Sequence, residues 1–205
     1  MEFLRKFSVI LLISISSFLS AQTTNSVAKA FEESYNLEKE GEYKQAIEKI
    51  KTVYSADNYE INLRLGWLNY YAGFFTESTT YYQKAISLMP YSIEAKFGLI
   101  NPLAALGNWN IVIKTYEKIL QLDPMNSTAN YRLGSIYYGK KEYNTAYKYY
   151  EKVVNSYPFD YNGTLMFAWT NYFLGKTREA RILFNKVLLI SPDDESATEG
   201  LGLIK

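Results

Sequence analysis

The stretch from Leu65 to Pro90 carries apolar residues at helical spacing on both sides of a central glycine. Its sequence is LGWLNYYAGFFTESTTYYQKAISLMP. Apolar residues three and four positions apart line one face of a helix. Gly73 favours a turn, because glycine readily adopts left-handed backbone conformations, and Pro90 cannot continue a helix. We therefore expect two amphipathic helices that are joined at Gly73 and end at Pro90.

Relatives of this stretch recur along the chain at a fixed spacing. The same interval separates four successive prolines: Pro90, Pro124, Pro158 and Pro192. Two residues after each proline stands a residue type that caps helix N-termini: Ser92, Asn126, Asp160 and Asp194. Counting back, Asn58 is the expected cap of the preceding unit and Ser26 that of the first, which is two residues shorter. Each boundary is thus a helix stop followed by a helix start.

The repetition predicts an all-α fold. A single helical pair cannot bury its apolar face alone, so neighbouring pairs stack into a solenoid. We expect a right-handed α-solenoid of five helix–turn–helix units, followed by a short C-terminal capping helix. The predicted units are residues 27–57, 59–91, 93–125, 127–159 and 161–193, and the capping half-repeat is 194–205.

The pattern of small and large residues inside the repeat resembles the tetratricopeptide repeat family. That family has a helix–turn–helix unit of about 34 residues with the pattern W-x2-L-G-x2-Y, A-x3-F and P. The unit after Asn126 carries this pattern as Leu133, Gly134, Tyr137, Ala146, Tyr150 and Pro158. The other units keep parts of it in the same register. The resemblance implies that the first helix of each unit lines a concave groove in which extended peptides usually lie.

The resemblance also implies which residues face that groove. The candidate ligand-binding residues are Tyr35, Arg64, Trp67, Tyr70, Tyr71, Asn101, Tyr131, Arg132, Tyr138, Trp169 and Tyr172. Exposed aromatic rings with arginine beside them are typical of binding surfaces. The alternative is that many of these rings simply pack between adjacent helices. Some members of the family clamp a carboxylate with Lys, Asn and Arg, but the Lys and Asn of that set are missing here.

Two positions depart from the repeat. Lys141 stands in the interhelical turn where the other units have glycine, so we expect a strained or reshaped turn. Pro102 falls in the middle of a predicted helix, where it removes a hydrogen bond and clashes with the carbonyl of Gly98. We expect a kink at Asn101 and Pro102 that turns this carbonyl towards the groove. The alternative is a tolerated local defect.

Residues 1–21 are typical of a secretory signal peptide. Arg5 and Lys6 precede an uncharged apolar run at 7–19, and the small residues Ser20 and Ala21 follow. The run is shorter than the roughly 20 residues that a transmembrane helix needs. We expect cleavage after Ala21 and export to the periplasm or cell envelope of a bacterium.

After the expected cleavage site, residues 22–26 form a predicted linker. The alternative to cleavage is an uncleaved N-terminal anchor, which would then be the attachment to the membrane. No cysteine follows the apolar run, so a lipoprotein anchor is excluded.

The composition excludes several kinds of chemistry. The 205 residues contain no Cys and no His. This removes disulfides, Cys/His zinc sites, thiol catalysis and Ser-His-Asp triads. Carboxylates remain as possible acids or bases, but no pair of them lies in a recognisable catalytic pattern. We therefore predict no enzyme activity, no metal and no cofactor.

The charge balance argues against nucleic acid as a partner. The whole chain has a formal net charge of +1. Removing residues 1–21 takes away Glu2, Arg5 and Lys6 and leaves 20 basic and 20 acidic residues. Nucleic-acid binding proteins normally carry an excess of Lys and Arg.

Two functions remain after these exclusions. The first is a non-catalytic interaction scaffold of the cell envelope that binds a peptide segment or partner protein in an aromatic groove. The second is a structural assembly component that docks through its ends or convex face onto an outer-membrane protein or complex. The identity of the partner and the oligomeric state stay open.

Overall fold

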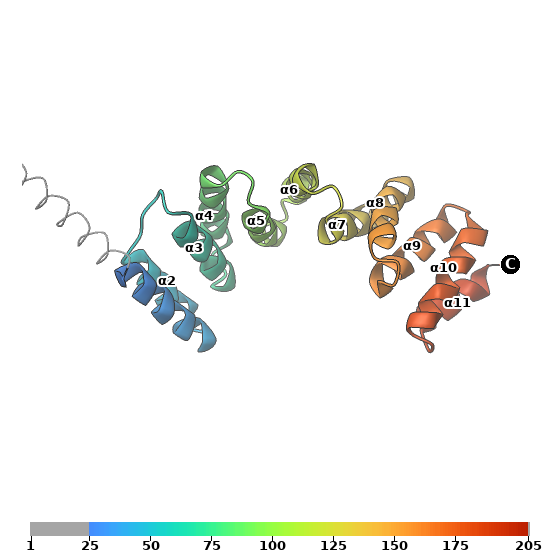
Figure 1. Ribbon diagram of the computed structural model, residues 1–205, viewed down its shortest axis with the longest axis horizontal. Coiled ribbons are helices and arrows are strands. Elements are labelled where there is room, and N and C mark those ends of the chain that lie inside the picture. The colour runs from blue at the N-terminus through green and yellow to red at the C-terminus, as the bar shows by residue number, and fades with distance from the viewer. Residues whose placement is uncertain (1–24, 205) are drawn as a thin grey trace, which may run out of the picture. The chain divides into compact units, whose positions relative to one another are not determined.

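The computed structural model describes residues 25–204, and every regular element in that range is a helix (Figure 1). The predicted all-α fold is confirmed. The predicted signal peptide, residues 1–21, lies outside the described residues. Residues 25 and 26, expected at the end of a linker, already belong to a helix that occupies described residues 25–39. None of the helices in the described range combines the length and the apolar character needed to cross a membrane.

The chain divides into two compact units, and each is described by itself. Unit 1 comprises the described residues 25–108. It contains helix 25–39, α2 (Tyr43–Lys51), α3 (Tyr59–Tyr71), α4 (Phe75–Leu88) and α5 (Ile93–Ala105). Helices α3 and α4 pack as a pair, and α5 packs on both of them. The core beside α2 and α3 consists of apolar residues from both helices, with residues of helix 25–39 packed against it.

Unit 2 comprises residues 109–204. It contains α6 (Trp109–Leu122), α7 (Ser127–Gly139), α8 (Tyr143–Ser156), α9 (Tyr161–Phe173), α10 (Thr177–Ile190) and α11 (Glu195–Leu203). Helix α7 pairs with α8, α9 pairs with α10, and α11 packs on α10 and α9. The boundary between the units falls in the turn of the predicted third repeat, residues 93–125. The division into five repeats and the right-handed winding remain predictions.

The predicted N-caps hold the helix starts. The side-chain oxygen of Asn58 accepts a hydrogen bond from the backbone N–H of Ile61 at 2.7 Å, and that of Asn126 accepts one from Ala129 at 3.0 Å. Equivalent bonds form at Ser92, Asp160 and Asp194. Each bond satisfies one of the N–H groups that the first helical turn leaves unpaired. These helices therefore begin where the repeat pattern predicts.

A second repeated polar position fixes the loop before each helix. The fourth residue after the cap is polar and buried in four units, as Asn62, Lys96, Asn130 and Thr164. The Nζ atom of Lys96 donates to the backbone carbonyls of Pro90 and Ser92. The amides of Asn62 and Asn130 donate in the same way to carbonyls of the loops that precede them. Asn62, Lys96 and Asn130 thus satisfy carbonyls that would otherwise be unpaired, whereas the hydroxyl of Thr164 is buried without a partner among the described residues.

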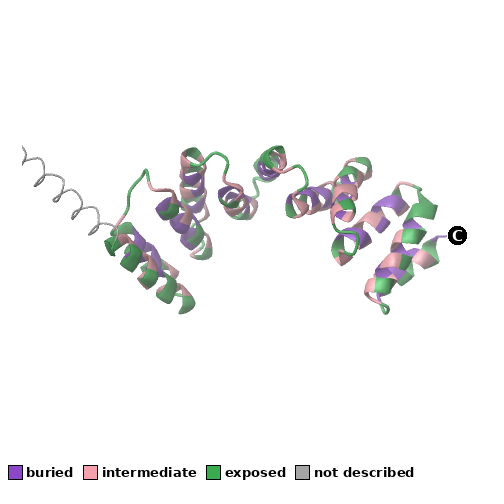
Figure 2. Cartoon of the chain, in the orientation of Figure 1, coloured by how far each residue is buried: buried purple, intermediate pink, exposed green. Residues whose placement is uncertain are grey.

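Large rings meet glycines in the cores. A Cβ atom added to Gly66 would lie 2.8 Å from the ring of Tyr82, and one added to Gly98 would lie closer still to the same ring. In unit 2 a Cβ atom on Gly134 would lie 2.8 Å from the ring of Tyr150. Glycine is therefore needed at these points because the ring occupies the space of a side chain. Figure 2 shows the resulting buried residues on the inner faces of the paired helices and the exposed ones on outer faces and loops.

Of the two departures from the repeat, the turn at Lys141 is confirmed, and the kink at Asn101 and Pro102 stays a prediction. Lys141 has a φ of 61°, in the left-handed region that the turn glycines also adopt, so the strained turn expected at this lysine is confirmed. Helix α5 continues through Pro102 to Ala105, and Pro102 is buried. Gly98, four residues earlier, is in contact with the ring of Tyr82, which gives this glycine a packing role independent of the proline.

The C-terminal helix α11 covers the end of unit 2. Ile204 is 6% exposed and belongs to the core that contains Phe184, and Leu201 packs against the same core. Arg181 of α10 donates from Nη2 to the backbone carbonyl of Ile204 at 3.0 Å. Leu203 is 48% exposed because it projects from the opposite side of the helix.

Candidate functional site

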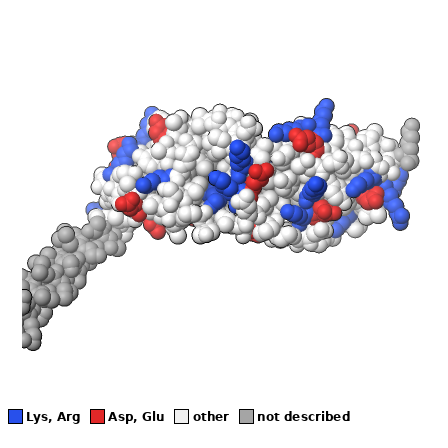
Figure 3. All heavy atoms as spheres, turned by 90° about the horizontal axis from the view of Figure 1, so that it is seen from above, with Lys and Arg blue, Asp and Glu red and all other residues white. Residues whose placement is uncertain are grey.

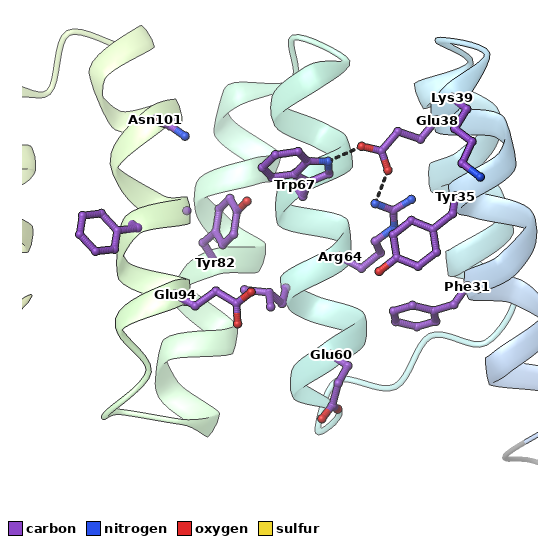
Figure 4. A pocket seen from close by; sticks show the side chains of 13 residues that line it. Phe31, Tyr35, Glu38, Lys39, Glu60, Arg64, Trp67, Tyr82, Glu94 and Asn101 are labelled. Carbon is purple, nitrogen blue, oxygen red and sulfur yellow. Dashed lines mark hydrogen bonds and ion pairs between the residues drawn. The ribbon is translucent and has the colours of Figure 1, made fainter. Parts of the chain in front are cut away.

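A pocket of about 910 Å³ opens on unit 1, on the first helices of three consecutive predicted repeats. Helix 25–39, α3 and α5 form its walls (Figure 4). The lining residues are Phe31, Tyr35, Glu38, Lys39, Glu60, Leu63, Arg64, Trp67, Tyr82, Glu94, Phe97, Gly98 and Asn101. Four of the eleven candidate residues from the sequence come together here: Tyr35, Arg64, Trp67 and Asn101.

Glu38 links two walls of the pocket. Its carboxylate accepts hydrogen bonds from Nη1 of Arg64 at 2.5 Å and from Nε1 of Trp67 at 2.6 Å (Figure 4). The Nε atom of Arg64 donates to Oγ of Ser34 at 3.0 Å. The guanidinium carbon of Arg64 lies 4.0 Å from the ring centroid of Tyr35, within range of a cation–π contact. Arg64, only 6% exposed, is therefore held by an ion pair, a hydrogen bond and a ring.

Arg64 and Arg132 occupy the same slot of the repeat but have different surroundings. The Nη2 atom of Arg64 is buried without a hydrogen-bond partner among the described residues. Arg132, on α7, is exposed, and it forms no ion pair within residues 25–204. The two candidate arginines thus differ, since Arg64 is an internally paired cation in unit 1 and Arg132 is a surface cation in unit 2.

Tyr82 brings a free hydroxyl to the pocket. Its ring is 3% exposed and lies against Gly66 and Gly98. The hydroxyl points towards Trp67 (Figure 4), and no described residue makes a hydrogen bond with it. Burial, followed by the nearby Tyr71 and Glu94, raises the pKa of Tyr82 far above its usual range. The hydroxyl is therefore neutral at physiological pH and can either donate or accept a hydrogen bond.

The remaining charges divide the pocket into an acidic and a basic part. Glu60 lies in the first turn of α3 and Glu94 in the first turn of α5. Both are exposed, and neither forms an ion pair with a described residue. Lys39, on helix 25–39, is the remaining cation of the lining besides Arg64. The acidic part lies at the N-terminal ends of α3 and α5, away from Lys39 (Figure 4).

Tyr70 and Tyr71 lie beside the pocket, in an aromatic cluster at the C-terminal end of α3. The ring centroid of Tyr71 is 4.6 Å from that of Trp67 and 5.5 Å from that of Tyr43, on which it stacks. Tyr70 contacts Tyr71 edge-on, with the ring centroids 5.2 Å apart. These two candidates support the position of Trp67 and are absent from the pocket lining.

The candidate residues of unit 2 form ring clusters. Tyr138 lies 5.9 Å from Phe173, and Trp169 lies 5.7 Å from Tyr172, as measured between ring centroids. Trp169 also lies 5.0 Å from Phe184, and its Nε1 donates to Oγ of Ser196 at 2.9 Å. Tyr131 contacts the buried Tyr150 edge-on. The candidate rings of unit 2 thus pack mainly against other aromatic rings, which differs from the open arrangement around the pocket of unit 1.

The sequence analysis did not predict several of the lining residues, although the sequence contains signals for three of them. Glu60 and Glu94 lie one repeat apart at the same place in their units, two residues after the cap. Glu38 follows Tyr35 by three residues and therefore shares its helix face. No such signal exists for Tyr82, whose access to the pocket comes from Gly98 on the next helix.

Basic and acidic side chains are mixed over the surface. On the face drawn in Figure 3, Lys and Arg lie next to Asp and Glu in small groups, separated by uncharged residues. Such a distribution differs from the continuous basic track that binds a phosphate backbone.

Paired helices, with a cap recurring once in each repeat and a pocket on their first helices, define an α-helical repeat protein. Residues 127–160 match the family model of the tetratricopeptide repeat. No curated protein matches the chain in sequence.

Several solved structures share the fold of the chain. The crystal structure of a tetratricopeptide repeat protein from Parabacteroides merdae ATCC 43184 is similar, with 22% identity, a TM-score of 0.73, and coverage of 86% of this chain and 71% of that one. MamA from Desulfovibrio magneticus RS-1 has 17% identity and a TM-score of 0.68, covering 83% and 97%. YrrB, described as a tetratricopeptide repeat protein with an unusual peptide-binding site, has 15% identity and a TM-score of 0.66, covering 86% and 98%. The chain therefore shares the fold of these repeat proteins, and residues 127–160 match a tetratricopeptide repeat.

Proposed function

We propose that the chain is a non-catalytic scaffold that binds a peptide segment or partner protein in the pocket of unit 1. Tetratricopeptide repeat proteins are typically binding scaffolds, which supports the class of function. The observation that carries the proposal is the pocket itself. Its volume lies in the range of roughly 300–1,000 Å³ that is usual for ligand sites. Its walls combine aromatic rings with a neutral hydroxyl that no described residue pairs.

The test removes one ring from the pocket wall. Trp67 is 39% exposed and lines the pocket, whereas Trp109 is 52% exposed on α6 and does not line it. The immobilised protein is exposed to an extract of the source cell envelope, and retained proteins are identified by mass spectrometry. We expect Trp67→Ala to lose a partner that the wild type and Trp109→Ala both retain. Circular dichroism of both variants checks the fold. Retention of every partner by Trp67→Ala would contradict the proposal.

We further propose that the protein acts in the periplasm or cell envelope of a bacterium. The proposal rests on the signal-peptide pattern of residues 1–21. Fractionation of the source cells tests it, together with N-terminal sequencing of the purified protein. We expect the mature chain to begin at Gln22 and to be found in the periplasmic or envelope fraction rather than in the cytoplasmic one. A chain found in the cytoplasm that still begins at Met1 would contradict export.

The second candidate function, docking as an assembly component, is favoured by the outer surface of α10. Ile182 is 60% exposed and Leu189 is 75% exposed. The two residues are seven positions apart and therefore lie on one helix face. If Ile182→Ser combined with Leu189→Ser releases a partner that Trp67→Ala retains, docking through this face replaces the pocket as the function.

A further inference from the structure

The hydroxyl groups of Tyr82 and Tyr150 occupy the same place in the repeat but have different partners. Each tyrosine stands at the same distance along the chain from the N-cap of its unit. In unit 2 the hydroxyl of Tyr150 donates to Oγ of Ser135 at 3.1 Å. The residue equivalent to Ser135 in unit 1 is Trp67, whose N–H is directed to Glu38. In unit 1 the hydroxyl of Tyr82 therefore faces the pocket, and no described residue makes a hydrogen bond with it. The residue as a whole is 3% exposed.

The charges next to this hydroxyl are negative. Glu94 acts on Tyr82 electrostatically and lines the same pocket, as does Glu60. Since Glu38 is neutralised by Arg64, the lining retains two carboxylates against one cation, Lys39. The equivalent positions in unit 2 are uncharged, namely Thr128, Asn162 and Ser196. The negative charge is thus a property of the pocket rather than of the repeat.

We propose that the pocket of unit 1 receives a cationic side chain, arginine or lysine, of the bound peptide. This inference rests on the proposed function and names the chemistry of its ligand. The N–H group of the cation donates to the hydroxyl of Tyr82, and Glu60 and Glu94 balance its charge. Trp67 and Phe97 flank the space and can contact the aliphatic stem or the cation itself.

An anionic ligand fits the same pocket poorly. It would lie beside two carboxylates that have no ion-pair partner among the described residues. Arg64 cannot balance it, because Nη1 is bonded to Glu38 and Nη2 is buried, with the ring of Tyr35 against the guanidinium. Lys39 remains, but it lies at the other end of the pocket from Glu60 (Figure 4). The carboxylate recognition known from some members of the family is therefore not supported by this arrangement.

The experiment compares three fluorescein-labelled peptides on the full mature protein by fluorescence anisotropy. The peptides have the sequence Gly-Ser-Gly-Xaa-Phe-Xaa-Gly-Ser-Gly, with Arg, Gln or Glu at both Xaa positions. We expect the Arg peptide to bind about tenfold more tightly than the Glu peptide, in line with two partly exposed ion pairs. Added salt should weaken binding of the Arg peptide and reduce this preference.

Variants then assign the preference to the pocket. Glu60→Gln combined with Glu94→Gln should remove about tenfold of the preference for Arg. Glu32→Gln combined with Glu77→Gln is the control, since it changes the net charge equally with two exposed residues outside the pocket lining. It should keep the preference. Tyr82→Phe should weaken the Arg peptide about fivefold, because it removes the acceptor.

The outcomes separate this inference from the proposed function. Equal affinity for the three peptides, with binding lost in Trp67→Ala, would overturn the cationic ligand and leave the peptide scaffold intact. Tighter binding of the Glu peptide, or a preference that both double variants reduce equally, would also overturn it. If none of the three peptides binds, the inference is wrong, and the envelope extract decides the proposed function independently.

Discussion

Tyr82 in unit 1 and Tyr150 in unit 2 occupy equivalent repeat positions but have different neighbours. Only unit 1 leaves the tyrosine hydroxyl available to a ligand. In unit 2 the hydroxyl of Tyr150 is bonded to Ser135, and the ring is fully buried. In unit 1 the larger Trp67 takes the place of that serine and turns to Glu38. Trp67 in place of the serine, together with Gly98 on the next helix, thus leaves in unit 1 an open pocket with a hydroxyl that no described residue pairs.

The arginines at the equivalent slot show the same difference. Arg64 is buried between Glu38 and Tyr35, whereas Arg132 is exposed. Unit 1 therefore contains a largely buried ion pair in the wall of its pocket. The comparison indicates that identical residues at identical repeat positions need not have the same role, because the previous helix supplies their partners.

The largest expected difference between the units concerns these arginines. Arg64→Ala removes one partner of a nearly buried ion pair and should lower the free energy of unfolding by about 3 kcal/mol. Arg132→Ala, at the exposed slot, should change it by no more than about 0.5 kcal/mol. Urea denaturation followed by circular dichroism measures both. Equal effects of the two substitutions would show that the ion pair contributes nothing specific to unit 1.

The next largest effect concerns the glycine behind the pocket tyrosine. In Gly98→Ala the new Cβ atom would overlap the ring of Tyr82, so that the ring or the helix must shift. We expect a loss of about 2 kcal/mol by overpacking. Gly139→Ala in α7 is the control, because open space surrounds its Cβ position. That substitution should stabilise the protein by up to about 1 kcal/mol through helix propensity. A stabilising Gly98→Ala would contradict the packing described here.

The hydroxyls themselves should give a smaller and unequal effect. Tyr150→Phe removes the hydrogen bond that the tyrosine hydroxyl donates to Ser135, so it should cost about 1 kcal/mol, while Ser135 keeps its bond to the carbonyl of Tyr131. Tyr82→Phe removes a hydroxyl that bonds to no described residue and should leave stability near the wild-type value. Thermal and urea unfolding at neutral pH measure the pair of variants. A cost for Tyr82→Phe as large as that for Tyr150→Phe would argue that a further group in the chain holds the pocket hydroxyl.

The smallest effect tests the turn of unit 2 against that of unit 1. Lys141 adopts a φ of 61°, and Gly73 adopts 81° at the equivalent turn. Lys141→Gly should stabilise unit 2 by up to about 1 kcal/mol, since glycine adopts this conformation without a steric cost. Gly73→Lys should destabilise unit 1 by a similar amount. The melting temperatures of both variants provide the comparison, and shifts of the same sign would contradict it.

Local signals in the sequence predicted most of the helix boundaries. The caps at Asn58 and Asn126 need only their own side chain and the next turn of the chain, so the pattern suffices to place them. The left-handed turn at Lys141 follows from the glycines at equivalent positions. The interpretation of Arg64 as a ligand contact came from its slot in the family, and the structure adds the partners that the slot does not reveal.

Contacts between distant residues could not be predicted in the same way. Glu38 meets Arg64 and Trp67 across 26 and 29 residues, and nothing in the spacing of the three residues indicates their meeting. Tyr82 reaches the pocket because Gly98 belongs to a different helix and lacks a side chain. Lys96 looks like a surface charge in the sequence, but its amine is buried on loop carbonyls. Each of these contacts depends on three-dimensional packing rather than on periodicity.

The bond network of Glu38 has a practical consequence for truncated fragments. A fragment that starts at Asn58 preserves α3 with its cap but deletes the carboxylate, the serine hydroxyl and the ring that hold Arg64. The guanidinium of Arg64 would then face solvent without its ion-pair partner, and the indole N–H of Trp67 would lose its hydrogen-bond acceptor. Binding measured on such a fragment would report on a damaged pocket, so a fragment for crystallisation or screening has to include the helix of residues 25–39.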